Sequence, residues 1–96
     1  MQKKLYIGTN TKMYKTIRQT VAFLDRLGSL TRDIDRSLLE LFVMPSYTAL
    51  DASAGTAHAW DITLGAQNMN WEDEGQFTGE VSPLMLEETG VRVVCI

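Results

Sequence analysis

The residues best suited to chemistry near the start of the chain are Asn10 and Lys12, which follow a short apolar run, Leu5–Ile7. In extended backbone two residues at this spacing point to the same side, so an amide and an ammonium group would face one point in space. A lysine together with backbone amides can hold a small anionic molecule. The plainer interpretation, a turn asparagine beside a solvated charge, stays open on these residues alone.

A long polar segment in the second half of the chain is the other candidate. An apolar run at 62–64 leads into Gly65-Ala66-Gln67-Asn68, and the polar residues that follow extend to Ser82-Pro83, a pair typical of a helix start. A connection this long between a strand and a helix exceeds what packing requires, which favours a functional role. The alternative is a mobile surface loop, and the aromatic residues Trp71 and Phe77 argue against it.

Residue types that often bind metals or act as nucleophiles give weaker signals. Glu72-Asp73-Glu74 is a run of acids, for which a solvated acidic loop is the preferred interpretation. The single histidine, His58, has no companion at metal-ligand spacing and is expected at the surface or at a boundary. Cys95 is the single cysteine, so no internal disulfide can form and a reducing compartment fits. We expect neither a metal nor a cofactor.

The elements that would position these residues alternate along the chain. Thr16 and Gln19 have the spacing of a capping box, and apolar residues then recur at helical intervals up to Gly28, a plausible helix stop. An apolar run at 38–44 ends at Pro45 and predicts a second buried strand. Ser46 would then cap a weakly patterned helix that stops at Gly55.

The remaining segments complete the same alternation. Residues 83–89 predict one or two helical turns ended by Gly90, and residues 91–96 predict a fourth strand. The first strand, Leu5–Ile7, is expected to be buried on both faces. The order predicts parallel strands joined by right-handed crossovers, in a single α/β segment that spans residues 1–96.

Composition excludes several classes of partner. The 96 residues include nine basic and twelve acidic residues, for a net charge of -3, and contain no basic run. Nucleic acid is therefore not an expected partner. No apolar run approaches the roughly 18 residues of a membrane-spanning helix, and the start lacks the apolar core of a signal peptide. We expect a cytoplasmic protein without membrane contact.

The sequences of both candidate segments resemble those of one family. Gly65-Ala66-Gln67-Asn68, Trp71-Glu72-Asp73 and the run at 75–83 resemble the third strand and third loop of triosephosphate isomerase. Asn10-Thr11-Lys12-Met13 resembles that family's Asn-Trp-Lys-Met motif. The resemblance covers essentially the whole chain but only the N-terminal part of the family's pattern. It implies the first four strands of a TIM (β/α)8 barrel, in which the site lies at the carboxyl ends of the strands.

The resemblance implies catalytic and substrate-binding roles for two residues. Lys12 would hold the substrate phosphate and stabilise negative charge on an enediolate oxygen, work that suits a compact cation where water is excluded. Asn10 would help to position Lys12. The implied reaction is cofactor-free proton transfer between dihydroxyacetone phosphate and glyceraldehyde 3-phosphate, a step of glycolysis and gluconeogenesis.

A homodimer is also implied by the resemblance. The third loop would project into a neighbouring subunit, where Thr78 would reach the partner's site. Glycines permit the tight turns of such a tip, and an aromatic side chain supplies apolar area to bury. The residues expected at this interface are Met13, Tyr14, Gly75, Phe77, Thr78 and Gly79.

Three departures from the family's pattern limit these expectations. Thr11 replaces the usual aromatic between Asn10 and Lys12, and Tyr14 stands where a small or polar residue is usual. The Thr11 replacement is consistent with a relative that acts on another sugar phosphate. Ile7-Gly8-Thr9 together with Lys15-Thr16 resembles a branch of the family that acts on erythrulose phosphates. The sequence also stops at Ile96, before the positions of the family's electrophilic histidine and glutamate base. A chain of these 96 residues is therefore expected to be inactive alone.

Two further alternatives belong to other classes. Four parallel strands would leave two unpaired sheet edges, so a barrel segment could persist by self-association without any catalysis. A small flavodoxin-like module would require a glycine-rich phosphate loop after the first strand. Gly8-Thr9-Asn10-Thr11 does not supply one, so this alternative ranks last.

Overall fold

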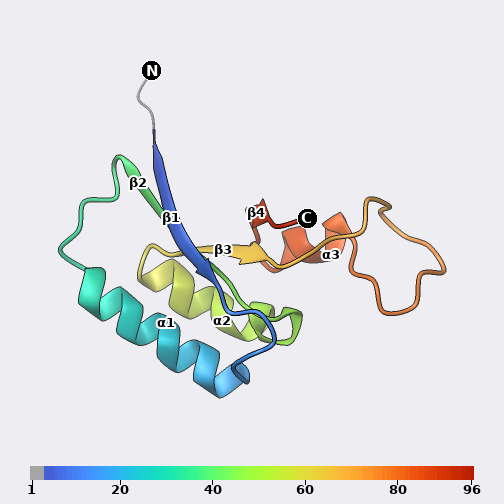
Figure 1. Cartoon of the computed structure of the whole chain (residues 1–96), viewed down its shortest axis with the longest axis horizontal. Helices are drawn as coiled ribbons and strands as arrows, with labels where there is room; N and C mark the ends of the chain where they lie inside the picture. Colours follow the sequence, from blue (N-terminus) through green and yellow to red (C-terminus); the bar gives the residue numbers. More distant parts are fainter. Residues whose placement is uncertain (1–3) are drawn as a thin grey trace.

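Four parallel strands and three helices alternate in the computed structural model, which describes residues 4–96 (Figure 1). The strands form one sheet in the order β1-β2-β3-β4. The predicted half-barrel architecture is confirmed, while the first three residues of the predicted segment lie outside the described residues. The elements are β1 (Leu5–Asn10), α1 (Ile17–Thr31), β2 (Leu39–Met44), α2 (Tyr47–Ala59), β3 (Thr63–Ala66), α3 (Pro83–Glu88) and β4 (Val93–Val94).

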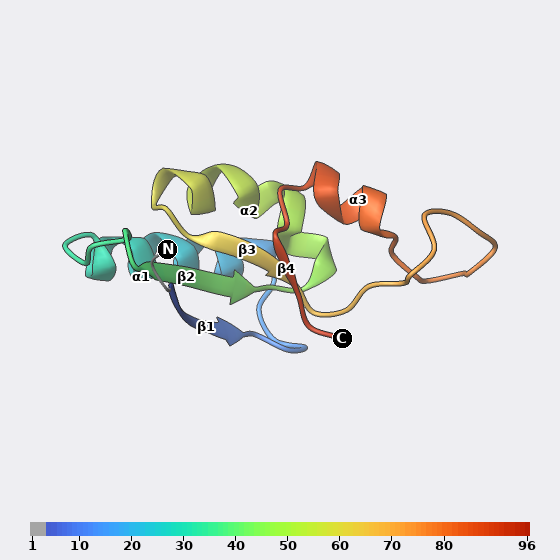
Figure 2. The same cartoon turned by 90° about the horizontal axis from the view of Figure 1, so that it is seen from above.

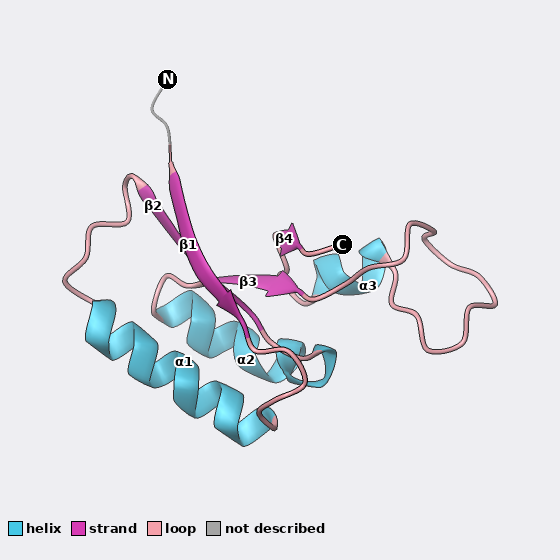
Figure 3. Ribbon diagram, viewed as in Figure 1, coloured by secondary structure: helices cyan, strands magenta, loops and turns pink. Residues whose placement is uncertain are grey.

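The core lies between the helices and one face of the sheet. Helices α1 and α2 run side by side along that face, as two views of the chain show (Figures 2 and 3). Leu41 and Val43 of β2 alternate with half-buried residues that point to the opposite, open face. The buried apolar residues of this core are Leu24, Leu41, Val43, Leu50, Ala57, Ile62, Leu64, Ala66 and Leu86.

Helix α1 begins as predicted but continues past its predicted stop. Thr16 and Gln19 form the expected capping box, whereas the helix runs through Gly28 to Thr31. A Cβ at Gly28 would lie 2.1 Å from the Trp60 side chain, so this glycine allows α1 and α2 to approach closely. Trp60 Nε1 also donates a hydrogen bond to Asp25 Oδ1 at 2.8 Å. The prediction that Gly28 ends α1 is wrong because packing, not chain reversal, requires the glycine.

Helix α2 is longer than predicted, while α3 matches its prediction. α2 passes through Gly55, which is exposed and has open space around it, and ends before Asp61 adopts a positive φ of 56°. His58 lies exposed on α2, as expected. In α3 the Ser82 side chain accepts a hydrogen bond from the Met85 N–H, and Gly90 ends the helical segment with a φ of 87°. The capping signal therefore located a helix more reliably than an isolated glycine did.

Strand β1 is exposed, which overturns the expectation that it is buried on both faces. Leu5, Tyr6 and Ile7 are 62%, 58% and 51% exposed. The reason is topological, because β1 pairs only with β2 among the described residues and the sheet face opposite the helices is uncovered. The fourth strand is also shorter than predicted, with Val93 and Val94 alone in strand conformation. Across residues 4–96, none of the helices combines the length and apolar character that crossing a membrane would require.

Candidate functional site

The candidate site lies where three neighbouring strands end. Asn10 is the last residue of β1, Met44 is the last residue of β2, and Gln67 directly follows β3. Because the strands are parallel, these three ends lie at one edge of the sheet. In parallel α/β folds this carboxyl edge is where ligands bind.

The backbone at Lys12 is held in a conformation that only a few residue types adopt readily. Its φ is 55°, in the left-handed region. The Lys12 N–H donates to Asn10 Oδ1 at 2.7 Å, so the asparagine side chain stabilises this turn. Asn10 is in strand β1, but the expectation that extended backbone continues to Lys12 is therefore wrong. The structure nevertheless brings the two residues together, through the asparagine side chain and the lysine backbone.

Gln67 joins the three strand ends, a role that the sequence reasoning missed. Its Nε2 lies 3.0 Å from the Met44 carbonyl oxygen, 3.1 Å from that of Lys12 and 3.3 Å from Thr11 Oγ1. An amide nitrogen carries two hydrogens, so the three acceptors share them. The signal that could have identified Gln67 was its position directly after a buried strand.

The ammonium group of Lys12 is exposed and has no partner within residues 4–96, where it forms neither a hydrogen bond nor an ion pair. Two other lysines of the same part of the chain differ in this respect. Lys4 Nζ lies 3.1 Å from Glu40 Oε1, and Lys15 Nζ lies 5.1 Å from the centre of the Phe23 ring. The site thus combines a fixed backbone with a cation that is available to an anionic ligand.

Thr11 is buried beneath this site. Its side chain is 8% exposed, and its N–H donates to the Met44 carbonyl at 3.1 Å, which extends the pairing of the first two strands. Thr11 Oγ1 accepts the Gln67 amide at 3.3 Å. Thr11 thus joins the β1 and β2 ends to Gln67 through polar contacts.

The segment at 67–82 forms a loop that projects beyond α3, away from the sheet (Figure 1). Its base is closed by Asn70, whose N–H donates to the Val81 carbonyl at 2.9 Å and whose Nδ2 donates to Glu80 Oε1 at 3.1 Å. On the returning side of the loop the Glu80 N–H donates to the Phe77 carbonyl at 3.0 Å, and Gly79 has a φ of 86°. The loop is thus an ordered projection rather than an unstructured connection.

The residues predicted for a dimer interface are all exposed. Met13 is 95% exposed, Tyr14 is 75% exposed and Phe77 is 51% exposed. Gly75, Thr78 and Gly79 are exposed in the same loop as Phe77. Trp71, also in this loop, is 80% exposed. These side chains are accessible to a second chain, and their contact with one stays a prediction.

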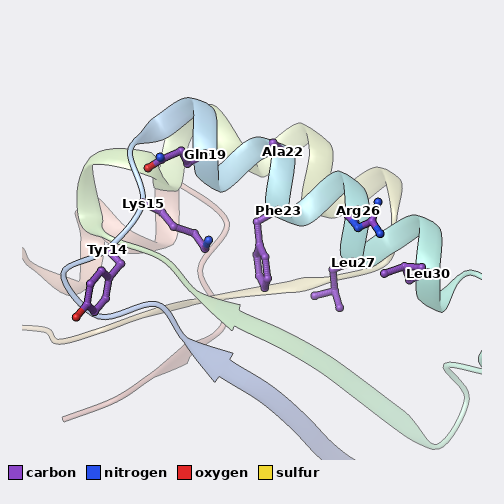
Figure 4. A pocket seen from close by; sticks show the side chains of 8 residues that line it. All are labelled: Tyr14, Lys15, Gln19, Ala22, Phe23, Arg26, Leu27 and Leu30. Atoms are coloured by element: carbon purple, nitrogen blue, oxygen red, sulfur yellow. The ribbon is translucent and has the colours of Figure 1, made fainter.

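A hollow lies elsewhere, along the side of α1 that faces the strands (Figure 4). It measures about 700 Å³ and opens beside β1, one of the two edge strands of the sheet within residues 4–96. Its lining is largely apolar and does not include Asn10, Lys12 or Gln67, so we do not assign the candidate chemistry to it. The lining residues are Tyr14, Lys15, Gln19, Ala22, Phe23, Arg26, Leu27 and Leu30.

Comparison with known proteins identifies the family. The family profile described as triosephosphate isomerase matches residues 5–96. A triosephosphate isomerase of Trichodesmium erythraeum is 43% identical over 95 residues, which cover 98% of this chain and 39% of that protein. An L-erythrulose-1-phosphate isomerase of Rhizobium etli is 40% identical over 91 residues, which cover 94% of this chain and 33% of that protein.

A third relative has the same pattern of coverage. The triosephosphate isomerase of Caldanaerobacter subterraneus is 41% identical over 90 residues, or 94% of this chain and 35% of that protein. The chain thus spans between 33% and 39% of the length of these three relatives. The profile match includes both the strand ends and the projecting loop described above. The chain therefore belongs to the triosephosphate isomerase family.

Proposed function

We propose that Lys12 and Asn10 form the phosphate-binding and charge-stabilising part of a sugar-phosphate isomerase site. The observation that carries this proposal is the Lys12 peptide, which neighbouring side chains fix in a left-handed conformation while its ammonium group stays free. The proposed reaction interconverts dihydroxyacetone phosphate and glyceraldehyde 3-phosphate through an enediolate. Such a reaction develops negative charge on an oxygen beside a phosphate dianion, and one preorganised cation can act on both.

Proton transfer between adjacent carbons also requires a base and an electrophile. At the carboxyl edge of the sheet the described chain presents an ammonium, amides and hydroxyls, and His58 lies on α2. We propose that a polypeptide of these 96 residues does not turn over substrate by itself. An assay of the purified chain, with Lys12→Ala as the blank, tests this. Turnover above that blank would refute it.

Phosphate binding is the direct test of the proposed role of Lys12. NMR titration with inorganic phosphate should shift the resonances of Asn10, Lys12 and Gln67, and Lys12→Met should abolish those shifts. The matched control is Lys15→Met, because Lys15 is three residues away and contacts the Phe23 ring instead. Equal phosphate affinity of the Lys12→Met variant and the unmodified chain would rule out the proposal.

A tetrulose phosphate is the second candidate substrate. It is favoured by the 40% identity to a relative named L-erythrulose-1-phosphate isomerase, which is close to the 43% for a relative named triosephosphate isomerase. Buried Thr11 beneath Lys12 is the local difference that could accommodate another sugar. Competitive displacement of phosphate by dihydroxyacetone phosphate and by erythrulose 1-phosphate would separate the two, since the cognate sugar should compete at lower concentration.

We also propose a cytoplasmic homodimer formed through the projecting loop. Trp71 and Phe77 give this loop exposed aromatic area of the kind that interfaces bury. The competing proposal is self-association without catalysis through the unpaired edge of β1. Light scattering after size-exclusion chromatography distinguishes them: Phe77→Asp should yield monomers in the first case, and Ile7→Lys should do so in the second.

A further inference from the structure

Ser46 occupies the helix-capping position of α2 without using its side chain as a cap. Its backbone has the non-helical geometry of an N-cap, with φ -58° and ψ 149°, but no N–H of α2 donates to its hydroxyl. Ser82 provides the contrast within the same chain, because its hydroxyl accepts the Met85 N–H at 3.3 Å. A serine at an N-cap normally accepts such a bond. The Ser46 hydroxyl therefore has another partner.

That partner is the Lys12 carbonyl oxygen, 34 residues away in the sequence, to which Ser46 Oγ donates at 3.3 Å. Gln67 Nε2 donates to the same oxygen at 3.1 Å, and the Thr11 hydroxyl lies farther from it, at 3.5 Å. With the Lys12 N–H bound to Asn10, both ends of this residue are tied to other parts of the chain. A non-glycine residue keeps a positive φ only when its surroundings hold it there.

We propose that Ser46 is a positioning residue for Lys12. The Ser46 hydroxyl holds the Lys12 peptide in its left-handed conformation and does not cap α2. This inference rests on the proposed function, in which Lys12 binds the substrate phosphate. The hydroxyl links the β1–α1 connection to the first turn of α2. A shift of that turn would therefore displace the lysine that the proposed site depends on.

The two possible roles of Ser46 require opposite properties of its side chain. A cap must accept a hydrogen bond, whereas a contact with a carbonyl oxygen must donate one. Ser46→Thr keeps both abilities, Ser46→Ala removes both, and Ser46→Asp caps well but cannot donate as a carboxylate. These three variants separate positioning from capping. Ser82→Ala, which removes a true serine cap far from Lys12 in sequence, is the matched control.

The experiment measures exchange of the Lys12 amide proton with water by NMR, because this proton is bound to Asn10 Oδ1 and is released when the turn opens. Loss of one hydrogen bond should accelerate the exchange about fivefold in Ser46→Ala and Ser46→Asp. Ser46→Thr and Ser82→Ala should leave it unchanged. Exchange at Leu24, in the core, reports whether each variant is folded.

Unchanged Lys12 exchange in the folded Ser46→Asp variant would overturn the proposal, as would equal acceleration in Ser46→Thr and Ser46→Asp. If Ser46→Ala fails to fold, the comparison of Thr with Asp still decides, because Asp strengthens the helix cap. The exchange measurement uses no phosphate. A failure of Lys12 to bind phosphate would therefore refute the proposed function while leaving the positioning by Ser46 measurable.

Discussion

Polar side chains have opposite roles at the carboxyl and the amino ends of the parallel strands, which are the carboxyl edge and the amino edge of the sheet. At the carboxyl edge Asn10, Ser46 and Gln67 bind the backbone of Lys12, and the lysine ammonium has no partner among residues 4–96. At the amino edge the charge itself is paired. Glu40 accepts hydrogen bonds from Lys4 and from the hydroxyl of Thr63, and these bonds lower the pKa of its carboxyl group.

The difference indicates which edge serves binding and which serves stability. A fixed backbone that leaves a cation free costs conformational energy and creates an attachment point for an anion. A paired carboxylate contributes modestly to folding and leaves no charge for a ligand. This division agrees with the general rule for (β/α)8 barrels, in which the carboxyl ends of the strands carry the chemistry. Variants at each edge should therefore affect different properties.

The largest effect is expected at Lys12, where one substitution can remove phosphate binding and also relieve the strain of the backbone. Lys12→Gly should abolish phosphate binding, since it removes the ammonium. It should also be about 1 kcal/mol more stable than Lys12→Ala, because glycine adopts the φ of 55° without strain. Phosphate titration and urea unfolding, followed by Trp60 fluorescence, measure the two properties. If the alanine variant were the more stable one, the strain at Lys12 would not be real.

Gln67→Leu should cost about 2 kcal/mol of unfolding free energy, because it removes the amide donor that three oxygen acceptors share, one of them on buried Thr11. Phosphate affinity should fall as well, since the Lys12 peptide loses a contact. Gln76→Leu, in the exposed loop, is the control and should change stability by less than about 0.5 kcal/mol. Equal losses of unfolding free energy in the two variants would show that Gln67 does not support the site.

Sequence reasoning predicted the elements because their signals are local. The capping box at Thr16 and the Ser82-Pro83 pair mark helix starts through bonds within one turn, and the structure contains both. The prediction that Gly28 ends α1 was wrong because a tertiary contact requires this glycine: the Trp60 ring packs against it. A glycine that ends a helix and one that admits a neighbouring side chain have the same sequence signature.

The candidate site was predicted only in part for the same reason. Asn10 and Lys12 are close in sequence, so their association was predictable even though the backbone geometry was not. Gln67 and Ser46 reach the Lys12 carbonyl from 55 and 34 residues away. No local pattern encodes that contact, because it depends on the register of three parallel strands. The exposure of β1 likewise depends on which strand edges are paired.

Glu40→Gln tests the amino edge through its response to acid. Thr63 and Lys4 lower the pKa of Glu40, so the folded state favours the carboxylate. Its contribution is present above the ordinary glutamate pKa of 4.5 and is lost as the pH falls toward the lowered native value. The variant should lose up to about 1 kcal/mol at neutral pH, and this loss should shrink as the pH falls below 4.5. Urea unfolding at neutral pH and below pH 4.5 measures the difference.

Tyr47→Phe tests the carboxyl edge through its response to alkali, the smallest expected effect. Partial burial, and next the nearby Glu80 carboxylate, raise the pKa of Tyr47 above its ordinary value of 10.0. The folded chain then holds this proton more tightly than the unfolded chain does, so unfolding releases it and stability falls as the pH rises past 10.0. The phenylalanine variant should lose less stability there than the unmodified chain. Urea unfolding on either side of this pH measures the difference. An undiminished loss in Tyr47→Phe would mean that the alkaline response does not arise at this edge, and the acid response of Glu40 would then have no counterpart across the sheet.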